Sequence, residues 1–292
     1  MGALSTGNCC LYVCRKRAGF PAMVIGIRGW AGAFFCKLRS MKIMSARHTL
    51  HTGRLQREVV IDCYYAADTT GPVQLLLLND GQHATTLDLA AKLAKQIAGK
   101  PILIAAIHAG PQRLQEYGTA RLVNERGQGL KATAYTRFVI RELLPFLEQQ
   151  YAAMQFTQKA FGGFSLGGLS ALDIVWQHPS VFQIAGVFSG ALWWRSRALD
   201  AGYNEATDRI MHKLVSGKGF QPGLRFFFAC GTEEETADRN HNGIIDVIDD
   251  TQDMVRILTG LGYKDVRYLE IAGGRHDEAT WGQGLDAFLD WL

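Results

Sequence analysis

Short apolar runs alternate with amphipathic stretches along the chain from residue 57 onward. The apolar runs are rich in β-branched and aromatic residues or are continuously hydrophobic, which is typical of strands buried on both faces of a sheet. They predict strands at 58–65, 73–78, 102–107, 160–164, 184–188, 224–230 and 266–271. Apolar positions at helical spacing predict helices at 87–98, 133–151, 166–177, 251–261 and 282–292. Strands separated by helices favour right-handed crossovers, so we expect an α/β fold with a mostly parallel central sheet and helices on both faces.

The composition excludes several classes of protein. Hydrophobic residues make up 48% of the 292 residues and charged residues 20%, which excludes a chain that is disordered throughout. No unbroken apolar run reaches the roughly 18 residues of a membrane-spanning helix. Residues 1–57 hold ten Lys and Arg and no acid, whereas residues 58–292 hold 21 Lys and Arg against 27 Asp and Glu. The mildly acidic body therefore lacks the basic footprint of a nucleic-acid-binding protein.

The basic N-terminal stretch is set apart from the body. Its apolar patch at 20–35 is interrupted by Arg28, whereas a secretory signal peptide has an uninterrupted apolar region. An amphipathic transit peptide and a biological start at an internal methionine are the alternatives. We expect a leader at 1–45 followed by a single domain at 46–292, with the compartment, cytoplasmic or periplasmic and secreted, left open.

A candidate nucleophile lies between a predicted strand and a predicted helix. Gly163-Phe-Ser165-Leu-Gly167 matches G-x-S-x-G, and a strand–turn–helix context is what a nucleophile elbow requires. The flanking glycines suit a turn in which a Cβ would clash, and the N-terminus of the following helix favours negative charge on a bound substrate. The sequence predicts Ser165 as the nucleophile, with a purely structural glycine turn as the alternative.

The serine needs a base and an orienting carboxylate. Hydrolases with this elbow follow the chain order serine, acid, histidine, and His276 is the one histidine after the last predicted strand. The acid is expected after the strand at 224–230, where Glu234 is favoured and Glu233 comes second. Glu235 and Asp238 are further candidates, and a solvated acidic loop is the alternative for each.

The tetrahedral intermediate needs backbone N–H donors. The N–H of Leu166 directly follows the nucleophile. The second donor is expected in Asn79-Asp80-Gly81-Gln82, the loop after the strand at 73–78, where Gly81 lets the backbone turn inward. We therefore predict the N–H groups of Gln82 and Leu166 as the oxyanion hole.

These motifs together resemble the putative esterase family of α/β-hydrolases, which includes enterochelin-esterase-like proteins, S-formylglutathione hydrolase, feruloyl esterase modules and mycolyltransferases. The resemblance covers roughly residues 50–292 and implies an α/β-hydrolase fold. It implies Ser165 as nucleophile, His276 as base and Glu234 as acid, with donors at Gln82 and Leu166. Many members of the family carry aspartate at the position of Glu234. The motifs that carry the resemblance are Leu-Leu-Asn-Asp-Gly-Gln82, Arg113-Leu-Gln-Glu-Tyr117, Glu142-Leu-Leu-Pro-Phe, Gly162-Gly-Phe-Ser-Leu-Gly-Gly168, His178-Pro-x-x-Phe182, Phe188-Ser-Gly-x-x-Trp193-Trp194 and Gly-Gly-x-His276.

The expected function is that of a serine carboxylic-ester hydrolase that acts through an acyl-enzyme on a small-molecule ester, with no cofactor for catalysis. An acyltransferase or thioesterase on the same triad and a catalytically silent binding protein are the alternatives. Aromatic rings and polar groups near the strand ends are candidates to wall the substrate pocket. These are His108, Arg113, Tyr117, Trp193 and Trp194.

A separate motif between the acid loop and the next helix resembles a calcium loop. Oxygen-bearing side chains alternate along it, Gly243 stands at the position of the sharp turn, and Asp249 replaces the usual glutamate at position 12. The predicted ligands are Asp238, Asn240, Asn242, Ile244 through its carbonyl, Asp246 and Asp249. A structural calcium ion is the prediction, and a solvated turn that caps the following helix is the alternative.

Overall fold

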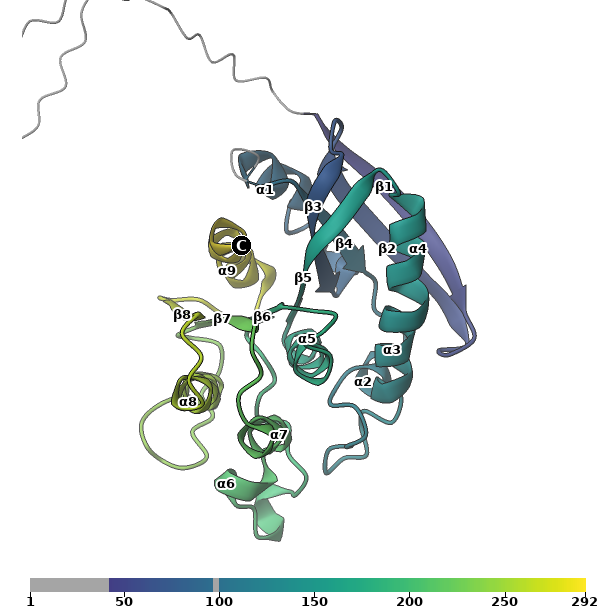
Figure 1. Cartoon of the computed structure of the whole chain (residues 1–292). Coiled ribbons are helices and arrows are strands. Elements are labelled where there is room, and N and C mark those ends of the chain that lie inside the picture. Colours follow the sequence, from purple (N-terminus) through teal and green to yellow (C-terminus); the bar gives the residue numbers. More distant parts are fainter. Residues whose placement is uncertain (1–41, 97–99) are drawn as a thin grey trace, which may run out of the picture. The chain divides into compact units, whose positions relative to one another are not determined.

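The strands form a single mixed sheet. The computed structural model describes residues 42–96 and 100–292, and in them eight strands pair in the order β1-β2-β4-β3-β5-β6-β7-β8 (Figure 1). The strands are β1 (Ile43–Thr52), β2 (Arg57–Ala66), β3 (Gly71–Asn79), β4 (Ile102–Ile107), β5 (Met154–Phe164), β6 (Ile184–Phe188), β7 (Arg225–Gly231) and β8 (Val266–Ile271). β1 pairs antiparallel with β2 and β2 with β4, while the pairs from β4 through β8 are parallel. The expected α/β-hydrolase fold, with its mostly parallel sheet, is confirmed.

Helices cover both faces of this sheet (Figure 1). Three short helical turns occur among the described residues: the 3₁₀ turns η1 (Gly81–His83) and η3 (Leu199–Ala201), and the π-helical turn η2 (Val139–Leu143), which joins two α-helices. The α-helices are α1 (Leu89–Gln96), α2 (Arg113–Glu116), α3 (Ala132–Phe138), α4 (Leu144–Gln150), α5 (Leu166–Gln177), α6 (Glu205–Asp208), α7 (Ile210–Lys218), α8 (Asp246–Gly260) and α9 (Glu278–Trp291).

The continuous apolar run of β3 shows why the core has two layers. Leu75 and Leu77 pack into a cluster with residues of α3, α4, α5, α7 and α8. Leu76 and Leu78 point to the other face and pack with residues of α1 and α9. All four leucines are buried, and each contributes about 1.5–3 kcal/mol relative to an exposed side chain. A strand buried on both faces has no room for polar alternation.

The first strand extends the sheet at its antiparallel edge. β1 pairs with β2 over ten residues, and its exposed and partly buried positions alternate. Arg47 of β1 donates two hydrogen bonds to Asp62 of β2, at 2.6 and 2.8 Å. The strand begins at Ile43, three residues before the expected domain boundary. The rest of the expected leader, residues 1–41, lies outside the described residues.

The long helix expected at 133–151 is three segments in the structure. α3 passes into η2 and then into α4, whose first turn contains Pro145. A proline lacks the N–H that an α-helical hydrogen bond would need, and the π-helical turn just before it accommodates that loss.

The two cysteines in the body are buried and free. Burial raises the pKa of the Cys63 thiol to about 11 and that of the Cys230 thiol to about 12. Both thiols therefore stay protonated near neutral pH and pack as small apolar groups.

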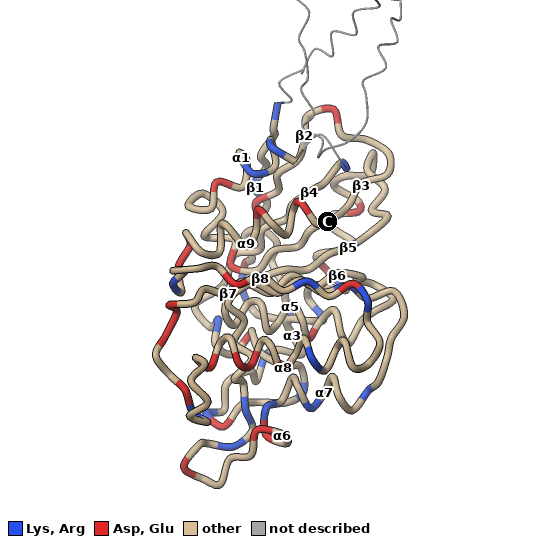
Figure 2. The backbone as a smooth tube through the Cα atoms, turned by 90° about the vertical axis from the view of Figure 1, so that its left-hand side faces the viewer, with Lys and Arg blue, Asp and Glu red and all other residues tan. Residues whose placement is uncertain are grey.

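Charged residues of both signs are interspersed along the described backbone (Figure 2). Within residues 42–96 and 100–292, no helix has the length and apolar character needed to cross a lipid bilayer.

Candidate active site

Ser165 lies in a strained turn between β5 and α5. Its φ of 53° and ψ of −123° fall in a region that residues other than glycine rarely adopt, at a cost of about 1–3 kcal/mol. The N–H of Ser165 donates to the Phe188 carbonyl at 2.8 Å, which ties the turn to β6. A Cβ on Gly163 would collide with the Gly167 carbonyl, and one on Gly167 would lie 2.5 Å from Asp80 Oδ2. The glycines of the motif are therefore needed for the elbow to close.

The Glu234 carboxylate is buried behind the His276 ring. His276 Nδ1 lies 2.8 Å from Glu234 Oε2, and the glutamate side chain is 1% exposed. The other oxygen, Oε1, accepts from Ser189 Oγ at 2.6 Å and from the Gly231 N–H at 2.5 Å. Three donors thus fix the carboxylate in one orientation.

The loops that carry these two residues pack directly on each other. The N–H of Glu233 donates to the Gly274 carbonyl at 2.8 Å, and a Cβ on Gly231 would collide with Gly274. Glycine at both positions lets the two backbones approach closely enough for the carboxylate to reach the imidazole.

The other candidate acids lie elsewhere. Glu235 Oε1 accepts from the Val247 N–H at 2.7 Å. Asp238 accepts from the N–H groups of Asn242 and Gly243, and the Glu233 side chain is exposed. Of the four candidates, Glu234 is the one that contacts His276.

Two supporting residues escaped the sequence analysis. The Trp281 indole N–H donates to Ser189 Oγ at 3.0 Å, which in turn bonds Glu234. The Trp281 ring meets the His276 ring edge to face at 5.4 Å and stacks on Phe164 at 5.2 Å. The position of Ser189, directly after a buried strand in Phe188-Ser-Gly, was the available signal for one of them.

Ser165, Glu234 and His276 line one cavity of about 350 Å³. Ser189, Gly190, Trp193, Glu235 and Val247 complete its wall. The hydrogen bonds among the described residues include none between Ser165 Oγ and the His276 ring. Catalytic hydrogen bonds are often long without substrate and tighten when it binds.

The loop that carries Gln82 is rigidly held. Asp80, which precedes it, has a left-handed φ of 61°, and its buried carboxylate accepts two hydrogen bonds from Arg113, at 2.7 and 2.8 Å. A Cβ on Gly81 would lie 2.5 Å from the Ala106 backbone. Gln82 Oε1 accepts from the Ala109 N–H at 3.0 Å, so the side chain also fastens the loop to the end of β4. Leu166 is the first residue of α5, where N–H groups have no partner within the helix.

Of the five candidate pocket residues, Trp193 lines this cavity. The other four do not, because their side chains are used in the scaffold. His108 lies 2.8 Å from Asp62, Arg113 pairs with Asp80, and Tyr117 and Trp194 are fully buried.

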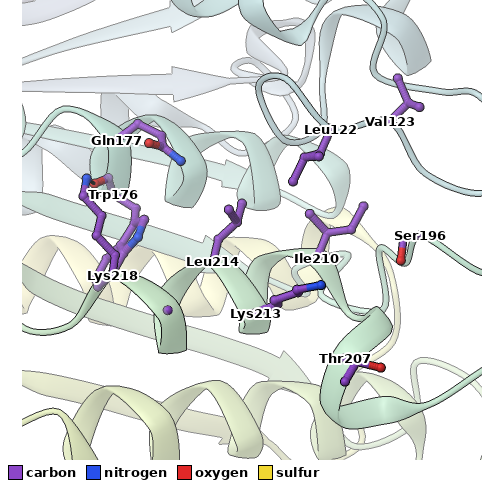
Figure 3. Close-up of a pocket in the computed structure, with 11 residues that line it drawn as sticks. Leu122, Val123, Trp176, Gln177, Ser196, Thr207, Ile210, Lys213, Leu214 and Lys218 are labelled. Atoms are coloured by element: carbon purple, nitrogen blue, oxygen red, sulfur yellow. Dashed lines mark hydrogen bonds between the residues drawn. The ribbon is translucent and has the colours of Figure 1, made fainter.

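A larger, mostly apolar cavity of about 630 Å³ lies between the end of α5 and α7 (Figure 3). Its walls include Leu122, Trp176, Ile210 and Leu214. None of the residues that surround Ser165 lines it, so it is separate from the candidate active site.

The expected calcium loop is closed by hydrogen bonds among its own residues. Asp238 accepts from the Gly243 N–H at 2.9 Å, and the side chains at positions 3 and 12 meet, with Asn240 Nδ2 2.8 Å from Asp249. At position 9, however, Asp246 accepts from the Arg239 N–H and pairs with its guanidinium. Within the described part of the chain, no three His, Cys, Asp or Glu side chains gather as metal ligands would.

Calcium binding therefore stays a prediction. Millimolar calcium is expected to raise the melting temperature by binding the folded state alone, and Asp238→Asn is expected to remove the shift. Isothermal titration together with thermal melting, with magnesium as the control, measures both effects. No binding heat and no shift at millimolar calcium would remove the site from consideration.

Residues 52–292 match the family model described as putative esterase. The chain therefore belongs to the putative esterase family. Comparison with curated proteins gives no match.

Solved structures with this fold include several named hydrolases, each less than 25% identical to the chain. The enterobactin esterase FES from Shigella flexneri is 19% identical with a TM-score of 0.64, over 84% of this chain and 58% of that one. The siderophore hydrolase EstB from Aspergillus nidulans is 17% identical with a TM-score of 0.64, over 85% and 95%. An IroE-like serine hydrolase from Shewanella oneidensis is 19% identical with a TM-score of 0.61, over 85% and 80%. The chain spans little more than half of the Shigella enzyme.

Proposed function

We propose that this esterase hydrolyses carboxylic esters through an acyl-enzyme on Ser165, with His276 as general base and Glu234 as the residue that orients the histidine. The observation that carries the proposal is the 2.8 Å contact between His276 Nδ1 and the buried Glu234 carboxylate, at a cavity that also holds Ser165. The strained elbow at Ser165 supports it, because strain of this kind is concentrated at functional sites.

The contact with Glu234 determines which imidazole nitrogen acts. A proton on Nδ1 is held by the carboxylate, so Nε2 keeps its lone pair and accepts the Ser165 hydroxyl proton as Oγ attacks the ester carbonyl. The same proton then passes to the leaving alcohol when the C–O bond breaks. Water repeats the sequence on the acyl-enzyme, and the carboxylic acid is released.

The negative charge on the tetrahedral oxygen needs preorganised donors. The N–H of Leu166 opens α5, where the positive end of the helix dipole also lies. The N–H of Gln82 belongs to the loop that the Arg113–Asp80 pair holds in place. We propose these two groups as the oxyanion hole.

Covalent labelling by a fluorophosphonate probe tests the proposal. The oxygen of an activated serine attacks the phosphorus of the probe and displaces fluoride. Peptide mass spectrometry then locates the adduct. Labelling at Ser165 in the folded protein is the expected result. No adduct, or an adduct at another serine alone, would overturn the assignment.

The charge of the cavity wall points to neutral rather than anionic esters. Glu234 and Glu235 both line the cavity, while none of its lining residues is Lys or Arg. Glu234 is hydrogen-bonded to His276, so Glu235 is the carboxylate that an incoming substrate meets. Burial raises the pKa of Glu235 above its ordinary value, so this carboxyl keeps its proton to a higher pH than a fully solvated glutamate. Discrimination against anionic esters is lost as the pH falls through this raised pKa, because the carboxyl then becomes neutral.

Glu235→Gln is expected to raise kcat/KM for an anionic ester about 5- to 10-fold, because one charge near the substrate is worth roughly 1 kcal/mol or more at a partly exposed site. The neutral ester should change little, since glutamine keeps an oxygen for the Val247 N–H. Mono-4-nitrophenyl succinate and 4-nitrophenyl butyrate, assayed at pH 8, form a matched pair. Glu233→Gln, exposed and outside the cavity wall, is the control. An equal response of the two esters to Glu235→Gln would contradict this selectivity.

A further inference from the structure

A second cavity of about 630 Å³ carries an unusual concentration of positive charge. Four guanidinium groups and one imidazole line it, and none of its lining residues is Asp or Glu. They come from the β1–β2 turn, the loop after α2, the helix formed by α3 and η2, and the end of α5. They are Arg54, Arg121, Arg137, Arg141 and His178.

Most of these basic side chains have no carboxylate as an ion-pair partner among the described residues. Arg54 pairs with Glu142 at 2.6 Å. Arg121, Arg137 and Arg141 take part in none of the salt bridges within residues 42–96 and 100–292. These three arginines are exposed, unlike Arg113 and Arg57, which pair with Asp80 and Glu116. Like charges gathered without counter-ions repel each other, so an anion bound among the three would relieve their mutual repulsion.

One wall is a single helical stripe. Its members follow one another at helical spacing, so they lie on one face of the helix. They are Thr133, Thr136, Arg137, Ile140 and Arg141. The last two belong to the π-helical turn η2, and such turns are concentrated at functional sites.

Arg121 lies beside this stripe in a strained conformation. Its φ of 73° is left-handed. Its N–H donates to Thr133 Oγ1 at 3.0 Å, and the N–H of Ala120 donates to the buried Asp173 of α5 at 2.8 Å. These bonds fix a backbone that the residue would not adopt alone. The two hydrogen bonds therefore hold Arg121 beside the stripe that carries Arg137 and Arg141.

The positive charges around this cavity also act on His178. Burial, followed by the charges of Lys218, Arg121 and Arg141, lowers the pKa of His178. The neutral ring can still donate one hydrogen bond to an anion.

We propose that this cavity is a binding site for a phosphate group. Guanidinium groups present paired N–H donors that match phosphate oxygens, and the hydroxyl of Ser180, an exposed residue that also lines the cavity, can add a further donor. The ligand supplies the negative charge that the cavity wall lacks. The phosphate belongs either to a free molecule or to a lipid headgroup.

The site is distinct from the esterase cavity. Ser165 precedes α5 and His178 follows it, so the twelve residues of the helix separate the two by about 18 Å at 1.5 Å per residue. The two cavities share no lining residue, and phosphate binding is independent of the chemistry at Ser165.

Isothermal titration of the full chain with inorganic pyrophosphate, at 150 mM salt, tests the proposal. We expect saturable binding at millimolar or lower concentration and a rise in melting temperature. Arg137→Gln combined with Arg141→Gln should weaken binding at least about tenfold, because each charge-assisted hydrogen bond contributes substantially to affinity. Both arginines are exposed and unpaired, so the double variant should fold and keep its esterase activity.

Lys95→Gln combined with Arg256→Gln removes two charges from other surfaces and serves as the matched control. Sedimentation with vesicles of phosphatidylglycerol, compared with phosphatidylcholine, identifies the source of the phosphate. If the protein sediments with the anionic vesicles and the Arg137/Arg141 variant does not, the site binds a lipid headgroup. If the protein binds pyrophosphate but does not sediment with these vesicles, the site binds a free ligand. Absence of both, or an equal loss in the control variant, would overturn the proposal.

Discussion

Ser165→Ala is expected to reduce kcat for ester hydrolysis by at least about 10⁴-fold, because no other group in the mechanism can form the acyl-enzyme. The fold should be unaffected. Ser165 Oγ makes none of the side-chain hydrogen bonds of the described residues, and alanine meets the same backbone strain at a φ of 53°. Initial rates on 4-nitrophenyl butyrate and thermal melting of the same preparation measure both properties.

Ser216→Ala provides the matched control, since this serine lies on α7 and bonds the His212 carbonyl. It should keep full activity and full labelling by the fluorophosphonate. Ser165→Ala should lose both together. Turnover above about one per cent of wild type in Ser165→Ala would show that hydrolysis proceeds by another route.

Much of the sheet could be predicted from the sequence because buried parallel strands are continuous apolar runs. β4, β6 and β8 match their expected ranges, and α5 begins and ends as its periodicity indicates. β1 was missed because an edge strand alternates exposed and partly buried residues, and its basic residues resembled the leader. Its assignment depends on pairing with β2, including Arg47 with Asp62, which no local pattern contains.

The candidate site shows the same division between local and distant information. Ser165 and His276 could be placed because each follows a strand in an order that the fold restricts. Glu234 was favoured among four neighbouring carboxylates, but the local sequence could not exclude the other three, because the close packing of Gly231 on Gly274 determines which one reaches the histidine. Trp281 acts through Ser189, a partner 92 residues away, and no spacing rule connects the two.

The pocket candidates at the ends of β3 and β4 illustrate a related limit. His108 follows β4 as expected, yet its ring turns back to Asp62 in β2. Arg113 and Tyr117 instead support Asp80, whose N–H lies 3.3 Å from the Tyr117 hydroxyl. A residue near the correct sheet edge can face the scaffold rather than the cavity, and the direction of the side chain decides its role.

His276→Ala is expected to lower kcat by about 10⁴-fold or more, since the serine then has no base and the leaving alcohol no acid. Loss of a structural contact could also lower activity, so thermal melting of the same preparation separates the two explanations. The melting temperature of His276→Ala should stay near that of wild type while kcat falls. Glu234→Gln should retain the ring but place an amide against Nδ1, which favours the wrong tautomer and costs roughly 10²- to 10⁴-fold. A His276→Ala variant that melts as wild type does and keeps more than about one per cent of wild-type turnover would show that another group accepts the proton.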